Sequence, residues 1–149
     1  MDLVYKTTML TQGGRVGSVQ TEDGAFKIKL AVPVEMGGKG GGPNPEQLFA
    51  GAFAACFEQS VRHIAKKNLM PLRGCYVEAT LAMYVTMEDA YRMGLTLTVH
   101  MAGALSQDDA DHLLERARGI CPYVDATKNN MTLNLSAVVD NPQPVVEAA

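Results

Sequence analysis

The stretch Asn44-Pro-Glu-Gln-Leu-Phe-Ala-Gly-Ala-Phe-Ala-Ala-Cys-Phe57 has the pattern of a helix around which the rest of the chain is arranged. Asn44 can cap this helix, and Pro45 suits the first helical position, where no N–H donor is needed. Gln47 lies at the spacing of a capping box. The stretch therefore predicts a helix that starts at Pro45, and it places Cys56 well inside that helix.

Cys56 is the first candidate for chemistry. At helical spacing it shares a face with Phe49, Ala52 and Phe53, so its thiol is expected to point into an apolar interior. A buried cysteine ordinarily acts as a small hydrophobic residue. Burial would also raise its pKa, and the helix N-terminus is too far away for its dipole to lower that pKa much. A reactive Cys56 therefore needs a nearby cation.

Arg15 is the candidate for that cation, because it follows a Gly-Gly turn and a guanidinium keeps its charge when buried. Glu46 is its natural carboxylate partner. Glu46 lies ten residues before Cys56, which corresponds to about 15 Å along a helix axis. A site that unites all three side chains thus requires a bend in the helix or a second copy of the chain. We expect the second copy.

The segments around this helix read mainly as strands joined by hairpin turns. The expected strands are Tyr5–Gln12, Arg15–Gln20, Phe26–Leu30, Tyr76–Thr86, Arg92–Ala102 and Met131–Val138. The first helix is expected to end at Lys67, and a second helix capped by Ser106 is expected to end at Gly119. This order predicts an α+β fold with antiparallel sheet. We expect a single domain over residues 1–149, with a core at about 5–138 and a loose tail at 139–149.

Composition excludes several classes of function. The net charge of -3 argues against a nucleic-acid or anionic membrane partner. The longest apolar run, Leu48 to Phe57, is about half of what a membrane span needs. The first ten residues lack the continuous apolar region of a signal peptide. We therefore expect a cytoplasmic protein with free thiols, unless one cysteine pair is redox-active.

The remaining cysteines and histidines do not suggest a metal site. The chain has three of each and no Cys-x-x-Cys motif, and His63 lies two helical turns beyond Cys56. Cys75, at the start of an expected strand, is interpreted as structural. Cys121 follows the second helix and precedes Pro122. From these residues alone, Cys56 and Cys121 are either inert core thiols or a working dithiol pair.

Four sequence blocks together resemble the organic hydroperoxide resistance (Ohr) proteins of the OsmC/Ohr family. The blocks are Gly-Gly-Arg at 13–15, Asn-Pro-Glu-Gln-Leu-Phe-Ala at 44–50, Ala-Ala-Cys-Phe at 54–57 and Cys-Pro-Tyr at 121–123. The resemblance runs from about Tyr5 to Leu135. It implies an OsmC/Ohr-like fold in which antiparallel sheets wrap around central helices in an intertwined homodimer.

The resemblance also implies roles for individual residues. Cys56 would be the peroxidatic thiolate and Cys121 the resolving thiol that forms a disulfide with it. Arg15 would activate Cys56 and orient the peroxide, and Glu46 would hold Arg15. The implied reaction reduces alkyl and lipid hydroperoxides to alcohols without a bound cofactor, and a lipoyl-type dithiol such as dihydrolipoamide, carried by a lipoylated protein, restores the thiols.

Aromatic side chains near the two cysteines suggest the kind of substrate. Phe49, Phe53, Phe57 and Tyr123 would line an apolar entrance that favours bulky organic hydroperoxides. Two alternatives remain: a peroxidase of the sister OsmC type with broader peroxide use, and a non-catalytic ligand-binding member of the fold.

The chain departs from the usual Ohr pattern after Cys-Pro-Tyr, where Val124-Asp125-Ala126-Thr127-Lys128-Asn129-Asn130 follows. The departure adds the carboxylate of Asp125 near Cys121. We expect this change to affect disulfide formation and docking of the reductant.

Overall fold

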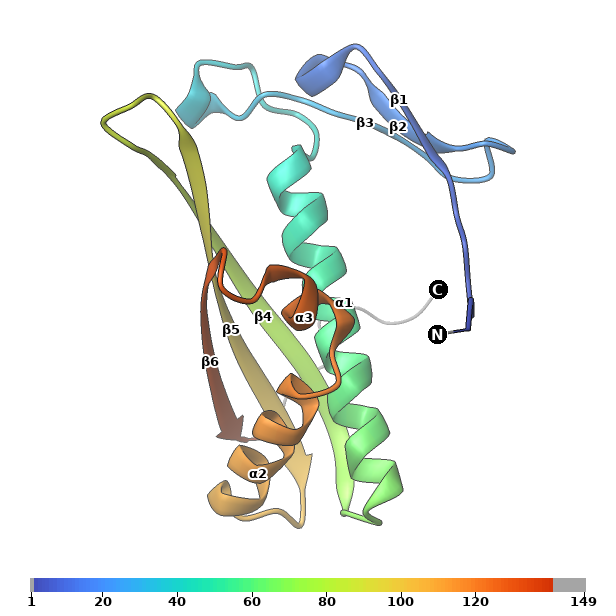
Figure 1. Cartoon of the computed structure of the whole chain (residues 1–149), viewed down its shortest axis with the longest axis vertical. Coiled ribbons are helices and arrows are strands. Elements are labelled where there is room, and N and C mark those ends of the chain that lie inside the picture. The colour runs from blue at the N-terminus through green and yellow to red at the C-terminus, as the bar shows by residue number, and fades with distance from the viewer. Residues whose placement is uncertain (1, 141–149) are drawn as a thin grey trace. The chain divides into compact units, whose positions relative to one another are not determined.

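The structure, a computed structural model, describes residues 2–140 (Figure 1). The chain divides into two compact units, and the division falls between Phe49 and Ala50 inside helix α1 (Pro45–Lys67). Residues 141–149, most of the predicted loose tail, lie outside the described residues. Val139, the first residue of that predicted tail, is the last residue of a strand.

The first unit contains a three-stranded antiparallel sheet. Its strands are β1 (Met9–Gln12), β2 (Ser18–Thr21) and β3 (Lys27–Lys29), in that order across the sheet. Each pairs with its neighbour in sequence, as hairpin connections require. The three predicted strands are thus present, but each is shorter than its sequence pattern indicated.

The turn between β1 and β2 corrects the prediction that Arg15 lies on a strand. Arg15 lies instead in a short 3₁₀ helix, η1 (Gly14–Val16). Two glycines permit this tight turn: Gly13 has a φ of 83°, and a Cβ at Gly17 would lie 1.7 Å from the carbonyl oxygen of Gln12. The close approach of the chain at Gly17 is a three-dimensional constraint that strand periodicity does not reveal.

A second 3₁₀ helix, η2 (Val34–Met36), precedes the glycine-rich segment that leads to α1. The predicted capping box at the start of α1 is confirmed. The backbone N–H of Gln47 donates to Oδ1 of Asn44 at 2.8 Å, and the N–H of Asn44 donates to Oε1 of Gln47 at 2.9 Å. Helix α1 ends at Lys67, as its sequence pattern predicted.

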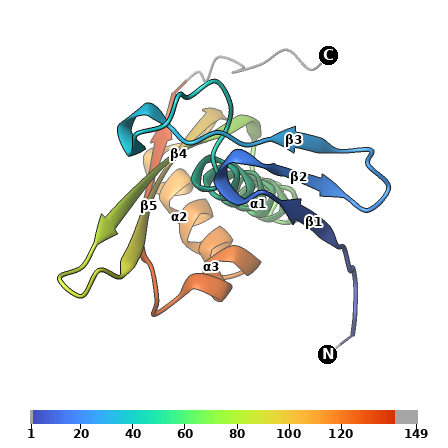
Figure 2. The same cartoon turned by 90° about the horizontal axis from the view of Figure 1, so that it is seen from above.

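The second unit is built on two long strands and the helices that cover one face of them (Figures 1 and 2). Strands β4 (Leu72–Val85) and β5 (Tyr91–Gly103) form an antiparallel hairpin. Helix α2 (Gln107–Arg118) follows, with the predicted cap at Ser106. Strand β6 (Thr132–Val139) completes the sheet in the order β4-β5-β6.

The α+β fold class is confirmed, but one pairing departs from the predicted antiparallel arrangement. β6 runs parallel to β5, with Gly94 opposite Thr132 and Met101 opposite Val139. The reason is the connection. The chain leaves the end of β5, passes through α2 and enters β6 near the end at which β5 began, and such a helical crossover makes the next strand parallel.

The core of the second unit lies between the sheet and the helices. Alternate residues of β5 are at most 1% exposed, as expected for the covered face of a strand. The helices that cover this face, α1 and α2, contribute apolar side chains that recur at helical spacing. The fully or nearly fully buried side chains include Phe53, Phe57, Val61, Ile64 and Ala65 of α1, Leu95, Leu97, Val99 and Met101 of β5, and Ala110, Leu113 and Ala117 of α2.

A third helix, α3 (Pro122–Thr127), was not predicted. The sequence pattern predicted only that the second helix ends at Gly119, before Pro122. Proline also suits the first position of a helix, because its missing N–H is not needed there. Cys121 is the N-cap residue of α3. This cysteine therefore lies at the corner between two helices.

Candidate functional site

In the first unit, Arg15 and Glu46 form a two-point ion pair. Nη1 of Arg15 donates to Oε2 of Glu46 at 2.7 Å, and Nη2 donates to Oε1. The η1 turn presents the guanidinium, and the first turn of α1 presents the carboxylate. Both residues belong to the same chain, so the predicted partnership of Arg15 and Glu46 needs no second copy. The expectation that a second copy brings this pair to Cys56 stays a prediction.

The pair fixes the charge of Glu46. Hydrogen bonding from Arg15 holds the pKa of the Glu46 carboxyl below its usual value, and its partial burial only partly opposes this effect. The Glu46 side chain is 16% exposed and that of Arg15 39%. A forked arginine held by an ionised carboxylate is a rigid, permanently charged group.

In the second unit, the thiols of Cys56 and Cys121 are in contact. Their Sγ atoms lie 3.8 Å apart, and the two residues are 65 positions apart in sequence. Cys56 is half-buried on α1, and Cys121 is 1% exposed. Both cysteines are free thiols. Two free thiols in van der Waals contact can form a disulfide after only a small approach of the sulfur atoms.

The surroundings of Cys56 within this unit do not favour its thiolate. Burial raises the pKa of the Cys56 thiol, and the neighbouring Cys121 adds to the increase. Hydrogen bonding from the backbone amide of Tyr123 acts in the opposite direction. This result agrees with the argument from sequence that a reactive Cys56 needs a cation.

The four aromatic residues predicted to line an entrance differ in how exposed they are. Phe53 and Phe57 are fully buried, so both belong to the core of the second unit. Tyr123 is 38% exposed and packs edge-on against Phe53, with ring centroids 5.6 Å apart. Phe49 is half-buried and belongs to the first unit. Among the second unit's three predicted entrance residues, Tyr123 is therefore the one that reaches the surface.

Cys75 differs from the other two cysteines. It is 7% exposed on β4, and burial raises its pKa to about 12. Its carbonyl oxygen accepts a hydrogen bond from Nη2 of Arg62 at 2.7 Å, and Arg62 is also paired with Glu58. These features are those of an unreactive core thiol.

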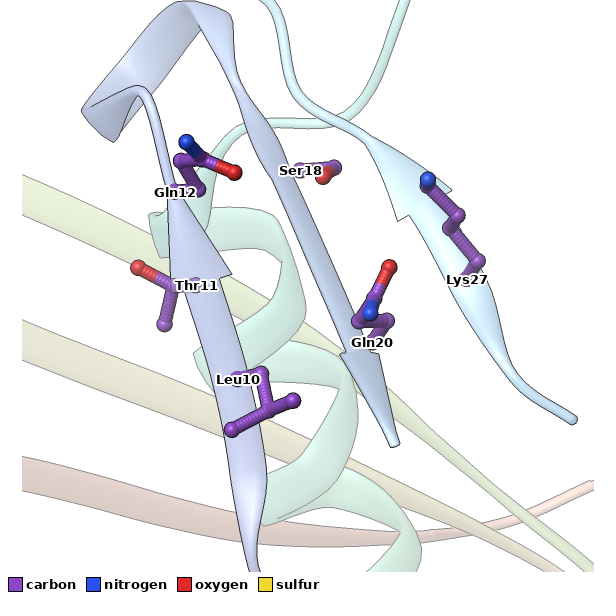
Figure 3. Close-up of a pocket in the computed structure, with 6 residues that line it drawn as sticks. All are labelled: Leu10, Thr11, Gln12, Ser18, Gln20 and Lys27. Carbon is purple, nitrogen blue, oxygen red and sulfur yellow. The ribbon is translucent and has the colours of Figure 1, made fainter. Parts of the chain in front are cut away.

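The first unit also contains a pocket that none of the predicted site residues lines. This open pocket of ≈ 290 Å³ lies on the β1–β3 sheet and is lined mainly by polar side chains (Figure 3). Its residues are Leu10, Thr11, Gln12, Ser18, Gln20 and Lys27. Within residues 2–140, no three His, Cys, Asp or Glu side chains cluster to hold a metal ion. In the same range, no helix has the length and apolar character needed to span a bilayer.

Sequence reasoning missed two features of the site. One is the amide of Tyr123, which acts on Cys56, and the other is the ring contact between Tyr123 and Phe53. Both depend on α3, whose only sequence signal was a proline directly after Cys121.

Comparison with known proteins places this arrangement in a family. Residues 38–136 match the family described as OsmC-like protein. A curated relative, organic hydroperoxide resistance protein-like 2 of Staphylococcus epidermidis, is 38% identical over 134 residues, which cover 89% of this chain and 94% of the relative.

Solved structures show the same fold. The crystal structure of an organic hydroperoxide resistance protein from Legionella pneumophila matches with a TM-score of 0.87 and 40% identity, and the match covers 91% of this chain and 98% of that one. The structure of a putative organic hydroperoxide resistance protein from Vibrio cholerae, with captopril bound in one of its active sites, matches with a TM-score of 0.86 and 34% identity. That match covers 92% of this chain and 94% of the other.

Proposed function

The chain belongs to the OsmC-like family, whose relatives include organic hydroperoxide resistance proteins, and on this premise we propose that it is a thiol-dependent peroxidase for organic hydroperoxides. One observation supports the proposal most directly: the thiols of Cys56 and Cys121 lie 3.8 Å apart. In this proposal Cys56 attacks the peroxide and Cys121 resolves the product.

The proposed reaction has three steps. The Cys56 thiolate attacks the peroxide oxygen, the O–O bond breaks, and the alkoxide takes up a proton and leaves as an alcohol, so that Cys56 becomes a sulfenic acid. The Cys121 thiol then attacks the Cys56 sulfur, forming the disulfide and releasing water. An external dithiol reduces this disulfide and is itself oxidised to a disulfide. We propose a lipoyl-type dithiol on a lipoylated protein for this last step, with no bound cofactor.

Arg15 is the proposed activator of Cys56. Burial raises the pKa of the Cys56 thiol, so the thiolate requires a cation that keeps its charge in an apolar site. The ion pair with Glu46 holds the guanidinium in one orientation. Phe49, Phe53, Phe57 and Tyr123 supply the apolar character that suits alkyl and lipid hydroperoxides.

We also propose that the chain is one domain that functions as a homodimer in the cytoplasm. Helix α1 runs unbroken through the boundary between the two units, which supports a single domain. The end of the β4–β5 hairpin exposes apolar side chains that a second copy would cover. These are Tyr84, Val85, Met87 and Tyr91, which are 59%, 62%, 99% and 67% exposed.

The test of the peroxidase proposal measures consumption of cumene hydroperoxide by the purified protein, with dihydrolipoamide, thioredoxin or glutathione as reductant. We expect turnover with dihydrolipoamide alone. Cys56→Ser should abolish turnover, and Cys121→Ser should abolish formation of the intramolecular disulfide. Cys75→Ser is the matched control and should behave like the wild type. Absence of turnover with every dithiol would contradict the proposal and favour a non-catalytic binding protein.

A further inference from the structure

Two aromatic rings join the segments that carry the cysteine pair. Phe53 lies three residues before Cys56 on α1, and Tyr123 lies two residues after Cys121 on α3. Their ring centroids are 5.6 Å apart with an interplanar angle of 80°, an edge-to-face arrangement that is favourable for aromatic pairs. The ring contact and the sulfur contact therefore lie side by side between the same two helices.

Among the residues that the structure describes, the backbone hydrogen bonds of Cys121 are made within its own segment. Its N–H donates to the carbonyl of Ala117 at 3.0 Å, and its carbonyl accepts from the N–H of Asp125 at 3.1 Å. These bonds fix Cys121 within the corner between α2 and α3. They do not tie the corner to α1, where Cys56 lies. The connection to α1 is made by the backbone amide of Tyr123 at Cys56 and by side-chain contacts.

The two rings are suited to this role because one is anchored and the other is not. Phe53 is fully buried in the core, whereas Tyr123 is 38% exposed at the start of α3. The position of the corner between α2 and α3 relative to Phe53 therefore depends on the Tyr123 ring. The same residue directs its backbone amide at Cys56. Displacement of Tyr123 would thus move the Cys121 sulfur and that amide together.

We propose that the contact between Phe53 and Tyr123 positions the Cys121 thiol against Cys56, and so decides whether the Cys56 sulfenic acid closes to a disulfide or is oxidised further. The inference rests on the proposed peroxidase function and adds to it. Tyr123 is a positioning residue in this role, in addition to any contact that it makes with substrate.

Two reactions compete for the Cys56 sulfenic acid. In the first, the Cys121 sulfur bonds to the Cys56 sulfur and water leaves. In the second, another hydroperoxide transfers an oxygen atom to the Cys56 sulfur, giving a sulfinic acid and an alcohol. The first reaction depends on the distance between the two sulfurs but not on peroxide concentration. The rate of the second reaction increases with peroxide concentration. Measurements at several peroxide concentrations therefore separate the two reactions.

The experiment compares Tyr123→Leu with Tyr123→Phe. Reduced protein is mixed with cumene hydroperoxide and quenched with acid at set times, and mass spectrometry measures the disulfide and the Cys56 sulfinic acid. We expect Tyr123→Leu to close its disulfide about two- to tenfold more slowly, the factor that corresponds to an edge-to-face aromatic pair. The sulfinic fraction should increase by a similar factor. Tyr123→Phe keeps the ring and should retain the wild-type rate of closure.

Two further variants test whether the effect belongs to the ring contact. Tyr5→Leu replaces a 77% exposed tyrosine of the first unit and serves as the matched control for loss of a tyrosine. If Tyr123→Leu does not fold, Tyr123→Met, which also lacks the ring but adapts to gaps, provides the same comparison. Each variant is first checked for a wild-type thermal transition in the reduced state.

The possible outcomes separate the two proposals. If the wild type forms no disulfide with peroxide, the proposed peroxidase function fails. If the wild type closes its disulfide and Tyr123→Leu closes at the same rate, the positioning role is wrong even though the peroxidase function holds. A variant that slows only the attack on peroxide, with closure unchanged, would make Tyr123 a substrate contact alone and would also overturn the inference.

Discussion

The guanidinium of Arg15 and the carboxylate of Glu46 meet through two hydrogen bonds across 31 positions of sequence. The pair joins a 3₁₀ turn to the first turn of α1, so one side chain fixes the orientation of the other. Several consequences of this and other local features can be measured.

Replacing Glu46 by glutamine should lower kcat/KM for cumene hydroperoxide about ten- to hundredfold, the factor that corresponds to a charge-assisted hydrogen bond. The amide cannot accept both bonds from Arg15, so the guanidinium loses its fixed orientation. Glu35→Gln, in η2 of the same unit, is the matched control and should retain wild-type kinetics. Equal rates for both variants would show that the ion pair has no part in catalysis.

The Arg15–Glu46 pair should make stability depend on pH in acid. Because the folded-state pKa of Glu46 is lowered, its contribution is fully present above the unfolded value of about 4.3. The contribution is lost as the pH falls through the lower folded value. Urea denaturation of the wild type and of Glu46→Gln should therefore differ most at neutral pH and converge in strong acid. A difference that grows on acidification would contradict this sign.

Cys75 should remain unmodified in the native protein. Its pKa of about 12 leaves almost no thiolate at neutral pH, and its side chain is buried. Pulse labelling of reduced protein with iodoacetamide at neutral pH, followed by peptide mass mapping, should find Cys75 labelled only after denaturation. Labelling of native Cys75 as fast as that of Cys56 would show that β4 opens or that the thiol is ionised.

Leu69 should be a site where glycine stabilises the protein. It has a φ of 53° after the end of α1, and the N–H of Met70 donates to the carbonyl of Ala65. This is the bonding of a Schellman motif, in which glycine is preferred at the left-handed position. Since a left-handed residue with a Cβ costs about 1–2 kcal/mol, Leu69→Gly should increase the free energy of unfolding by up to about 1 kcal/mol.

The matched control for this change is Leu69→Ala, which removes the 92% exposed side chain but keeps the Cβ. Thermal denaturation should show a gain for glycine and none for alanine. Equal gains would assign the effect to the loss of an exposed apolar side chain.

The proposed homodimer can be tested at the β4–β5 hairpin. Val85 is 62% exposed within one chain, so Val85→Glu should not affect the fold of that chain but should oppose burial in an interface. Sedimentation equilibrium should give twice the chain mass for the wild type and a concentration-dependent shift to the chain mass for the variant. Leu69→Ala should sediment like the wild type. A wild-type protein that sediments as a single chain would exclude the dimer.

Local signals in the sequence were sufficient for α1 and α2 and their N-terminal caps. The capping boxes at Asn44 and Ser106 depend on residues three positions apart, and both are present in the structure. The end of α1 at Lys67 was also correct. Such features need no information about distant parts of the chain, because their hydrogen bonds are made within one turn.

The remaining errors concern contacts between distant segments. Arg15 was expected to start a strand because it follows Gly13-Gly14, whereas the structure has a 3₁₀ turn there with a close approach of the chain at Gly17. The parallel direction of β6 depends on where the chain returns to the sheet after α2. The residue pattern along β6 carries no information about that point. Motif resemblance suggested the pairing of Cys56 with Cys121, but their 3.8 Å separation required the structure.

The parallel pairing of β6 affects the order in which the site can assemble during folding. The β4–β5 hairpin and α1 use contacts close in sequence, whereas β6 joins β5 only after the long crossover that carries Cys121 has closed. Contacts of large sequence separation form slowly. A chain still emerging from the ribosome would thus present Cys56 before Cys121 has a fixed place beside it. In the proposed reaction, an encounter with peroxide during that interval would oxidise the first thiol without the protection of a disulfide.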